Sequence, residues 1–426
     1  MARFVTRASA GLLVCRPNGR QFGHLGMEMV MALGLARRER SSVAFVRPSP
    51  LVNPALLELE SPEVQIVRLG ALAQRWWAAR WWSWRVQETW GRAWHEFRDA
   101  FLTEVARLLR DRAGDERLPA GLRRRLKQAK QRLPRGSGVR PIDAAPYLLR
   151  LAIRDGVPVR LREEVLARAS RQAAALGIDP GARIVTVHAR EAGYKRGREV
   201  HEKVIRSPIR RDDGTRNVRI DTYLPAIDYL VGCGYTVVRL GDPTMQPVVR
   251  PGVIDLALDS RRTPELELLC LLRSEFLLAG ESGPSVVTLL TNTPTLTLNA
   301  TDPVSSFPIR RDWLYALKRV VDLETDRMLT LQEMASPVYL GALRDTDRFR
   351  FLSHTPEEIL EGVQEMVAFL AAPPLESAKQ AAYREQVTAT ANELAKTMRY
   401  VRKWGPDDGF LGDGRIASFF AERYWA

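Results

Sequence analysis

The chain has 426 residues, and its 64 lysine and arginine residues outnumber its 50 aspartate and glutamate residues, which gives a formal net charge of +14. This length exceeds what one hydrophobic core usually serves and predicts two domains, while the charge predicts anionic partners. No apolar run approaches the roughly 18 residues of a membrane span, the N-terminus lacks a signal-peptide pattern, and the cysteines suggest no disulfide framework. We therefore expect a cytoplasmic protein, soluble or peripheral at the inner membrane face.

Strands and helices alternate over about the first 70 residues. The predicted elements are a strand at 11–15, a helix at 23–37, and strands at 43–46 and 64–69. This alternation indicates a parallel sheet with crossover helices. We predict an N-terminal Rossmann-like domain over residues 1–110, followed by a basic connector at 111–145.

The predicted N-terminal domain includes a segment that is unusually rich in tryptophan. Seven of the ten tryptophans lie within residues 75–94, where arginines alternate with them; they are Trp76, Trp77, Trp81, Trp82, Trp84, Trp90 and Trp94. On a helix, such residues could bind an anionic membrane surface. Packing within the domain or at a subunit interface accounts for them equally well, and stacking on a sugar acceptor is a third use. The sequence leaves these three uses open.

A second α/β pattern begins after the connector. Its predicted strands are at 184–188, 236–240, 253–256 and 276–279, and its predicted helices are at 223–231 and 264–272. This pattern indicates a second doubly wound domain over residues 146–350. Residues 351–426 form a helical region, with long amphipathic helices at 356–370 and 376–400. The expected fold class is α/β, with two Rossmann-like domains that face a cleft.

The segment after the strand at 276–279 is a candidate phosphate site. The apolar run breaks at Gly280, and a helix then begins before a further strand. The residues around the start of this helix are Glu281, Ser282, Gly283, Pro284 and Ser285. The free N–H groups and the dipole of a helix start favour an anion, although ordinary capping produces the same residue pattern.

Polar side chains follow two other strands of this half. His188 and Arg190 follow one strand, and Arg239, Gly241 and Asp242 lie at the end of another. Because the carboxyl ends of parallel strands meet at one edge of a sheet, we expect these residues to converge with the helix start. Arg190 and Arg239 could then bind a diphosphate through bidentate contacts, without a metal. A surface ion pair is the alternative for either arginine.

Residues 194–219 carry nine lysines and arginines and show little apolar periodicity. This composition fits a loop that closes over an anionic ligand, although a solvated charge run has the same composition. We predict lid or acceptor contacts for Tyr194, Arg216, Asn217 and Tyr223. The five histidines of the chain show no zinc-ligand spacing, so no metal site is expected.

Several motifs of the second half resemble a family of bacterial glycosyltransferases. They include Val187-His188-Ala189-Arg190, Arg239-Leu240-Gly241-Asp242, Gly280-Glu281-Ser282-Gly283 and residues 294–299, in order within residues 180–370. The resemblance implies a GT-B fold, a nucleotide sugar held mainly by the C-terminal domain, and metal-independent transfer with no further cofactor. A weaker likeness to fucosyltransferases, in the His-x-Arg motif and the glycine- and serine-containing loop at 280–285, favours a GDP-sugar. The predicted donor-binding residues are His188, Arg190, Arg239, Gly241, Asp242, Glu281, Ser282, Gly283, Ser285 and Asn299.

The first strand-to-helix turn of the N-terminal half is the expected approach for the acceptor. It contains Gly23, His24, Gly26 and Glu28. An imidazole near its usual pKa could take a proton from an acceptor hydroxyl, as inverting transfer requires, so His24 is the predicted base and Glu28 the second candidate. A capping or packing role is the alternative for His24. The two glycines are consistent with a close backbone approach to a ligand.

Two other function classes fit parts of the sequence. The net charge and the arginine-rich connector fit a nucleic-acid-binding protein, but no recognition motif supports that class. Rossmann-like halves also bind NAD, but the first turn lacks G-x-G-x-x-G and no acidic residue is placed to hold a ribose. We therefore predict a glycosyltransferase with a nucleotide-sugar donor, whose acceptor the sequence does not identify.

Overall fold

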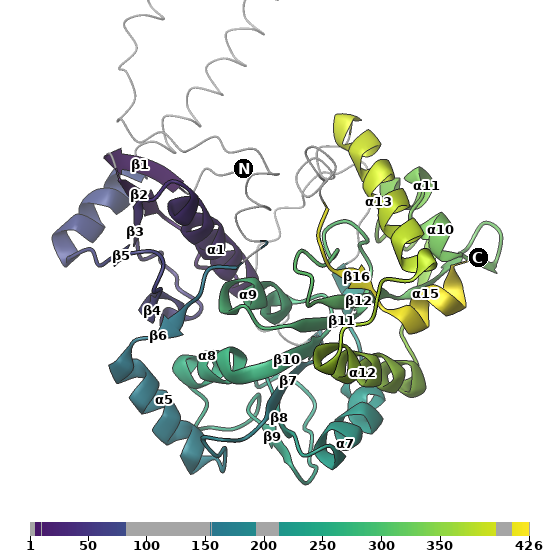
Figure 1. The fold of residues 1–426 in the computed structure, drawn as a ribbon, viewed down its shortest axis with the longest axis horizontal. Coiled ribbons are helices and arrows are strands. Elements are labelled where there is room, and N and C mark those ends of the chain that lie inside the picture. The colour runs from purple at the N-terminus through teal and green to yellow at the C-terminus, as the bar shows by residue number, and fades with distance from the viewer. Residues whose placement is uncertain are drawn as a thin grey trace, which may run out of the picture.

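The computed structural model describes residues 5–9, 11–81, 154, 156–192, 213–397 and 411–425. These residues form an α/β structure with two sheets that consist mainly of parallel strands (Figure 1). The predicted fold class, α/β with two Rossmann-like halves, is confirmed. The predicted connector at 111–145 and residues 193–212 of the predicted lid lie outside the described residues.

The N-terminal sheet has four strands in the order β1-β2-β3-β5. Strands β2 (Leu12–Cys15), β3 (Ser42–Phe45) and β5 (Ile66–Val67) are parallel, and α1 (Phe22–Arg38) connects the first two. These elements match the predicted ones, although the last strand is shorter than expected. Strand β1 (Val5–Ser9) pairs antiparallel with β2 and was not predicted.

A short strand pairing ties the two halves of the chain together. The 3-10 helix η1 (Pro54–Glu58) leads into β4 (Leu59–Glu60), which pairs antiparallel with β6 (Arg160–Leu161). Helix α5 (Glu163–Ala175) follows β6 and packs against α8 (Pro264–Arg273). The segment β6–α5, which precedes the second sheet, thus contacts β4 of the first half and α8 of the second half.

The second half contains a parallel sheet of seven strands in the order β16-β12-β11-β10-β7-β8-β9. In chain order the strands are β7 (Ile184–His188), β8 (Thr236–Arg239), β9 (Val253–Asp255), β10 (Ser274–Ala279), β11 (Thr295–Ala300), β12 (Leu314–Leu317) and β16 (Arg415–Ile416). The first five confirm the predicted strands. Strand β16 was not predicted because its two residues carry no clear periodic signal, and β12 was not predicted although it lies in the apolar run 313–317.

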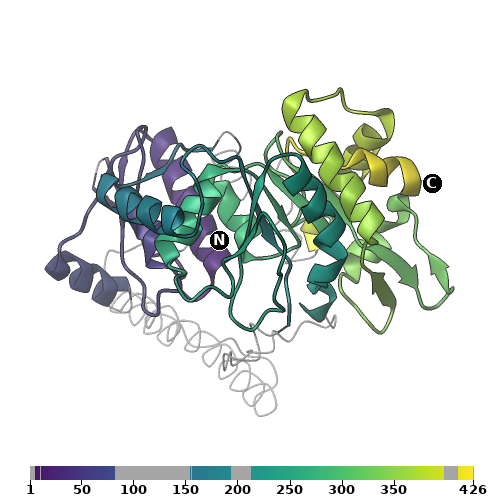
Figure 2. The same cartoon turned by 90° about the horizontal axis from the view of Figure 1, so that it is seen from below.

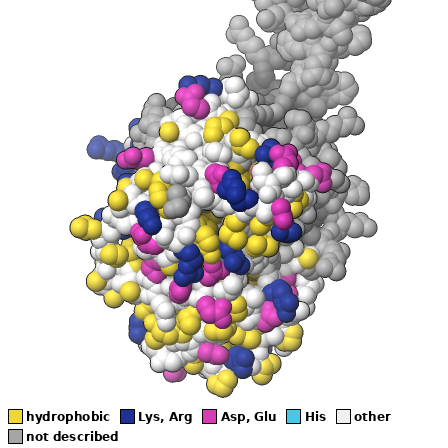
Figure 3. Space-filling view, turned by 90° about the vertical axis from the view of Figure 1, so that its right-hand side faces the viewer, with side chains coloured by type: hydrophobic (Ala, Val, Ile, Leu, Met, Phe, Trp, Pro, Cys, Tyr) yellow, Lys and Arg dark blue, Asp and Glu magenta, His cyan; other side chains and the backbone are white. Residues whose placement is uncertain are grey.

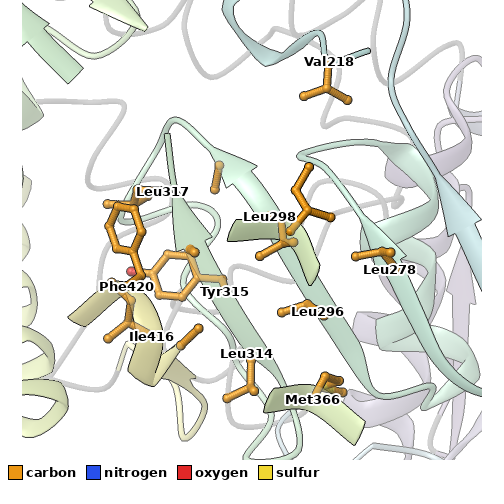
Figure 4. Packing of buried hydrophobic residues seen from close by; sticks show 14 of the residues in the cluster. Val218, Leu278, Leu296, Leu298, Leu314, Tyr315, Leu317, Met366, Ile416 and Phe420 are labelled. Carbon is orange, nitrogen blue, oxygen red and sulfur yellow. The ribbon is translucent and has the colours of Figure 1, made fainter. Parts of the chain in front are cut away.

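Alternate side chains of these strands face two different helical layers. Leu278 belongs to the core under α7 (Leu224–Gly232) and α12 (Pro356–Ala371), which Figure 4 shows from close by. Leu277 belongs to the core on the other side, under α8 and α9 (Gly283–Thr291). Because both faces of the sheet are covered, its central strands β7, β11 and β12 are buried along their whole length.

The C-terminal helices extend the first of these layers. Helix α13 (Ala378–Thr397) places the hydroxyl of Tyr383 2.7 Å from that of Tyr315 in β12. Helix α15 (Ser418–Tyr424) follows β16 and completes the core. Figure 2 shows these helices and the N-terminal half at opposite ends of the molecule. The two helices predicted after residue 355 are confirmed in the described part of the chain.

A smaller antiparallel sheet lies beside the main one, in the order β14-β13-β15. Its strands are β13 (Arg319–Asp322), β14 (Arg327–Met328) and β15 (Phe349–Leu352). The short helices α10 (Leu331–Met334) and α11 (Pro337–Gly341) connect the last two strands. Capping side chains of Thr330 and Ser336 start these helices. This sheet begins directly after β12, at the edge where the candidate site lies.

The two halves meet where α1 packs against α9 (Figure 1). A Cβ atom on Gly23 would lie 3.1 Å from the Cα of Gly283, and one on Gly26 would lie 2.9 Å from the side chain of Val287. Leu25 of α1 belongs to the same core as residues of α9 and β10. Gly23 and Gly26 therefore permit close packing of two helices, which corrects their predicted approach to a ligand.

Residues 71–81 are helical and pack against the other face of the N-terminal sheet. Trp81 is 2% exposed and Trp77 packs against the same cluster, so internal packing accounts for these two side chains. Trp76 is 51% exposed and carries the guanidinium of Arg80 4.5 Å from its ring centroid. The remaining tryptophans of the segment, Trp82, Trp84, Trp90 and Trp94, lie outside the described residues.

Charged side chains of both signs are mixed on the face formed by the C-terminal helices (Figure 3). Arg423 pairs with Glu361 at 2.8 Å, and Lys379 pairs with Glu422 at 3.0 Å. This face is therefore not the continuous basic surface that binding of nucleic acid requires. In the part of the chain that the structure describes, no helix is long and apolar enough to cross a membrane.

The contact between α1 and α9 predicts a stability effect. In Gly23→Ala, the new methyl group would meet the backbone of Gly283, which cannot rotate away. We expect a net loss of about 1–3 kcal/mol, the usual cost of overpacking, even though alanine favours a helix. The control is Gly232→Ala in α7, where a Cβ meets no atom within 4 Å. Thermal unfolding of both variants at one scan rate tests this, and a Gly23→Ala protein as stable as the control would contradict it.

Candidate functional site

The predicted polar residues gather at the carboxyl edge of the seven-stranded sheet. Strands β12, β11, β10 and β7 are neighbours and run in the same direction, so the residues that follow them lie along one edge. Arg190 follows β7, Glu281 follows β10, Thr301 follows β11 and Lys318 follows β12. Ligands of doubly wound sheets bind at such edges.

Helix α9 begins at this edge, as the sequence predicted. The N–H of Ser282 donates to Oγ of Ser285 at 3.1 Å, and that hydroxyl donates to the carbonyl of Ser282 at 2.7 Å. The hydroxyl of Ser282 is itself buried and faces the helix start in the manner of a capping box, but it makes no hydrogen bond of ordinary geometry within the described residues. Gly283 and Pro284 remain partly exposed, so the first turn is accessible.

His188 ends β7 and is 7% exposed. Its Nδ1 is buried without a hydrogen-bond partner among the described residues. Burial lowers the pKa of His188 to about 4, and the charges of Arg239 and Arg190 act in the same direction. The imidazole is therefore neutral at pH 7, and a nitrogen without a partner in a buried position is suited to a hydrogen bond with a ligand.

Arg190 and Asn217, predicted separately as donor and lid contacts, lie together. The guanidinium of Arg190 donates to Oδ1 of Asn217 at 2.8 Å, and the N–H of Val218 donates to the carbonyl of Arg190 at 3.0 Å. The 3-10 helix η2 (Asp213–Arg216) directly precedes Asn217. The described end of the predicted lid is thus attached to the end of β7, whereas Tyr194 lies outside the described residues.

Glu281 is buried and belongs to a network with the following strand. Its carboxylate accepts hydrogen bonds from the N–H of Thr301 at 2.9 Å and from its hydroxyl at 2.7 Å, and it pairs with Arg344. These contacts fix the carboxylate at the sheet edge. Glu281 therefore neutralises a cation of the protein, and these contacts account for its burial without the predicted donor contact.

Arg239 has a different role from the predicted one. Its side chain is fully buried, with ion pairs of 2.9 Å to both Glu191 and Asp255 and a further hydrogen bond to the carbonyl of Gln246. A guanidinium that is enclosed by two carboxylates cannot also bind a diphosphate from solvent. The ion pairs instead hold the loop after β8 against the residues that follow β7 and β9.

Tyr223 and Asn299 also serve the fold rather than a ligand. The side-chain amide of Asn299 donates to the hydroxyl of Tyr223 at 3.1 Å, and its oxygen accepts the N–H of His354 at 2.7 Å. All three residues are almost completely buried, and Tyr223 ends the 3-10 helix η3 (Ile220–Tyr223). Their predicted roles in the lid and at the donor are therefore corrected to a network under the sheet edge.

Gly241 and Asp242 shape the loop after β8. A Cβ atom on Gly241 would lie 2.2 Å from the sulfur of Met245 and 3.1 Å from the Cβ of Ala257, so a side chain here would require Met245 to move. Oδ1 of Asp242 accepts the N–H of Thr244 at 3.0 Å, which is a turn contact. The structure explains both residues by local geometry, and their predicted donor contacts are not needed to account for them.

The N-terminal half contributes the first turn of α1. His24 is exposed and directly follows Gly23, whose backbone contacts the start of α9. Glu28 instead accepts the N–H of Asn18 at 2.6 Å, so it fixes the loop before α1. This contact corrects the second candidate base to a structural role. His24 remains the predicted base on the side of the N-terminal half.

The sequence did not predict Lys318, Thr301 or Arg344 as residues of this site. Lys318 is 3% exposed, and its amine donates to the carbonyl of Asn217 at 2.8 Å. It directly follows the apolar residues 313–317, and a lone lysine after such a run would have been a usable signal. Thr301 and Arg344 have no comparable signal, because their roles depend on a contact between distant segments.

Comparisons with known proteins were made with both the sequence and the structure. No protein-family model matches the sequence, and no curated protein matches it. Among solved structures, the glycosyl transferase family 9 protein of Veillonella parvula shares 13% identity at a TM-score of 0.40, covering 86% of this chain and 99% of its own. The NodZ α-1,6-fucosyltransferase soaked with GDP-fucose shares 12% identity at a TM-score of 0.31, covering 66% of this chain and 93% of its own. A structure of the fucosyltransferase NodZ from Bradyrhizobium shares 12% identity at a TM-score of 0.28, covering 66% of this chain and 92% of its own.

The structures that the chain resembles are therefore glycosyltransferases, as the sequence motifs predicted. With TM-scores of 0.40 and lower, these matches carry no conclusion about the donor or the acceptor of this chain.

The ion pairs of Arg239 predict that replacing this arginine destabilises the folded protein. Arg239→Met would leave Glu191 and Asp255 without their shared cation in a buried position, and we expect a loss of about 3–5 kcal/mol in the free energy of unfolding. The control is Arg219→Met, which removes an exposed pair with Asp221 and should change the free energy of unfolding far less. Urea unfolding at pH 7 measures both, and equal losses would contradict the structural role.

Proposed function

We propose that the chain is a glycosyltransferase that moves a sugar from a nucleotide-activated donor to the hydroxyl group of an acceptor. The main support is the set of groups at the carboxyl edge of the large sheet: the guanidinium of Arg190, the accessible start of α9 and the buried Nδ1 of His188. A cation, a helix start and a neutral hydrogen-bonding group suit a diphosphate ester.

The diphosphate would lie between Arg190 and the first turn of α9. Arg190 would neutralise charge on the phosphate oxygens. The N–H groups of Gly283 and Ser285, which carry no net charge, would donate hydrogen bonds to the same oxygens. In the described residues, no group of histidine, cysteine, aspartate or glutamate side chains is arranged to hold a metal ion. We propose that these protein groups carry the leaving diphosphate themselves.

The acceptor would approach from the side of α1. Its hydroxyl oxygen would form a bond to the anomeric carbon while the bond from that carbon to the diphosphate breaks, and the nucleoside diphosphate would leave with the bonding electrons. His24 would take the proton of the hydroxyl, as inverting transfer requires. The contact of the neighbouring Gly23 with the start of α9 supports this role, because it brings the α1 turn close to the donor site.

Donor binding and turnover should depend on different residues. In calorimetric titrations with GDP, UDP, dTDP and CMP, we expect one of the four nucleotides to bind. Because of the His-x-Arg motif, we expect that nucleotide to be GDP. Arg190→Met should weaken that nucleotide about tenfold or more, since a charge-assisted contact is lost. His24→Gln should leave the affinity within about twofold and lower the hydrolysis or transfer rate of the corresponding nucleotide sugar by about 10²-fold or more.

Arg250→Met is the matched control for Arg190→Met, because Arg250 is an exposed arginine away from this edge and should leave the affinity unchanged. Each titration is repeated in the presence of EDTA. Because the proposal assigns neutralisation of the diphosphate to protein groups, it predicts the same affinity with and without EDTA. Binding of NAD alone, or salt-sensitive binding of a short nucleic acid alone, would reject the transferase in favour of those classes. Full turnover by His24→Gln would exclude His24 as the base.

We further propose that the exposed side of the helix at 71–81 contacts an anionic membrane surface. Leu72 is 82% exposed and Trp76 51% exposed, and Arg75 and Arg80 lie beside them. An indole with apolar and basic neighbours suits the boundary between headgroups and acyl chains. A lipid-linked acceptor would be available at such a surface.

Sedimentation with vesicles tests the membrane contact. The wild-type protein should sediment with vesicles that contain phosphatidylserine more than with pure phosphatidylcholine, and the doubly substituted Leu72→Ser, Trp76→Ser protein should lose about tenfold in partition, because apolar area no longer enters the lipid. Val249→Ser is the control, since Val249 is 91% exposed elsewhere. Equal partition of all three proteins would reject this surface.

A further inference from the structure

A buried cation, Lys318, lies at the same edge of the sheet as Arg190. Lys318 directly follows β12, and its N–H donates to the carbonyl of Ala300 in β11 at 2.7 Å, which fixes its backbone. The side chain is 3% exposed, and its amine donates to the carbonyl of Asn217 at 2.8 Å. A lysine that is both buried and bonded to a neutral carbonyl is unusual, because burial of an ammonium group normally requires a paired carboxylate.

Asn217 connects Lys318 to Arg190. Its carbonyl accepts the amine of Lys318, while Oδ1 of its side chain accepts the guanidinium of Arg190 at 2.8 Å. The N–H of Asn217 donates to the carbonyl of Gly214, so the residue is held on three sides. The two cations start from β12 and β7, on either side of β11 and β10, and reach the same residue. They are therefore held in a fixed relation above the sheet edge.

The amine of Lys318 is bonded to a carbonyl, and no carboxylate of the described residues forms an ion pair with it. Glu281, after β10, is the acidic side chain that acts on Lys318, but it already pairs with Arg344. Arg190, after β7, repels it, and His354, after β15, is buried nearby with its pKa lowered to about 4, chiefly by burial, so it is neutral. An anion that enters at Arg190 would bring a negative charge to the ammonium group of Lys318.

We propose that Lys318 is a second cation of the anion site, fixed relative to Arg190 through Asn217, and that its charge is required for tight binding of a nucleoside diphosphate. This inference rests on the proposed function, since it concerns the same site. It assigns the site to a ligand with at least two negative charges, because Arg190 and Lys318 would each contact a charged oxygen of the ligand.

The inference predicts a particular dependence of affinity on pH. Burial lowers the pKa of Lys318 to about 8, the charge of Glu281 opposes this shift and that of Arg190 adds to it. A bound anion stabilises the ammonium form, so the pKa is higher in the complex than in the free protein. Affinity is therefore constant below about pH 8 and falls above it, by up to about tenfold per pH unit, as the free protein loses the proton.

The first experiment compares wild-type protein with Lys318→Met and Lys318→Gln in titrations with GDP from pH 6.5 to 9.5. Both variants remove the charge, while glutamine keeps an N–H donor for the carbonyl of Asn217. We expect both to bind about tenfold more weakly than wild type at pH 7 and the difference to shrink above pH 8. Ionisation of the guanine base affects all three proteins equally and cancels in the comparison. Lys379→Met, which removes an exposed lysine, is the control.

The two variants separate a charge from a structural support. Suppose that Lys318→Gln binds GDP as tightly as wild type and that the affinities of wild type and both variants depend on pH in the same way. Lys318 then serves only as a hydrogen-bond donor to the carbonyl of Asn217, and the inference is wrong. If neither variant folds, proton uptake by the wild type decides. Calorimetry at pH 8.5 in two buffers of different ionisation enthalpy should show net proton uptake on binding, and zero uptake would overturn the inference.

Inorganic pyrophosphate distinguishes failure of the inference from failure of the proposed function. If no nucleotide binds but pyrophosphate binds wild type about tenfold more tightly than Lys318→Gln at pH 7, the anion site stands and the nucleotide-sugar donor is rejected. If GDP binds and Lys318→Gln does not differ from wild type, the donor stands and the inference is rejected. If neither ligand binds wild type, both are rejected.

Discussion

The structure depends on the close packing of α1 against α9, because this contact joins the two sheets into one body. Glycines at the contact let the two helix backbones approach within a distance that a side chain would prevent. The same contact sets the start of α9, which carries the proposed diphosphate, against the first turn of α1, which carries His24. Packing of the two halves and assembly of the candidate site are therefore one event.

Buried charge is distributed unequally along the carboxyl edge of the large sheet. At one place, Arg239 is enclosed by two carboxylates and serves to hold loops together. At another, Lys318 is buried with its amine against a carbonyl, and the partly buried Arg190 donates to an amide oxygen. Since a buried ammonium group without a carboxylate is costly, the position of Lys318 makes sense where a ligand supplies the counter-charge. The difference separates two arginines that the sequence alone ranked together.

The sequence predicted the elements that carry their own periodic signal. The strand–helix alternation around α1 and the five strands from β7 to β11 followed from apolar runs and turn residues, and so did the start of α9. Strand β16 was missed because it is only two residues long and depends on its pairing with β12, whereas β12 was missed although the apolar run 313–317 marks it. The same limit applies to the site: Arg190 was found by its position after a strand, whereas the pairing of Glu281 with Arg344 depends on a contact across the fold. Tyr223 and Asn299 were misassigned because burial is invisible in a motif.

The shared core under α1 has a consequence for how the chain is made. The side of α1 that contains Gly23 and Gly26 packs against α9, which is far along the sequence. During synthesis, that apolar side has no native cover until the ribosome has released the second half of the chain. The N-terminal sheet is consequently a late partner in assembly although it is made first, and its long-range contacts favour slow folding.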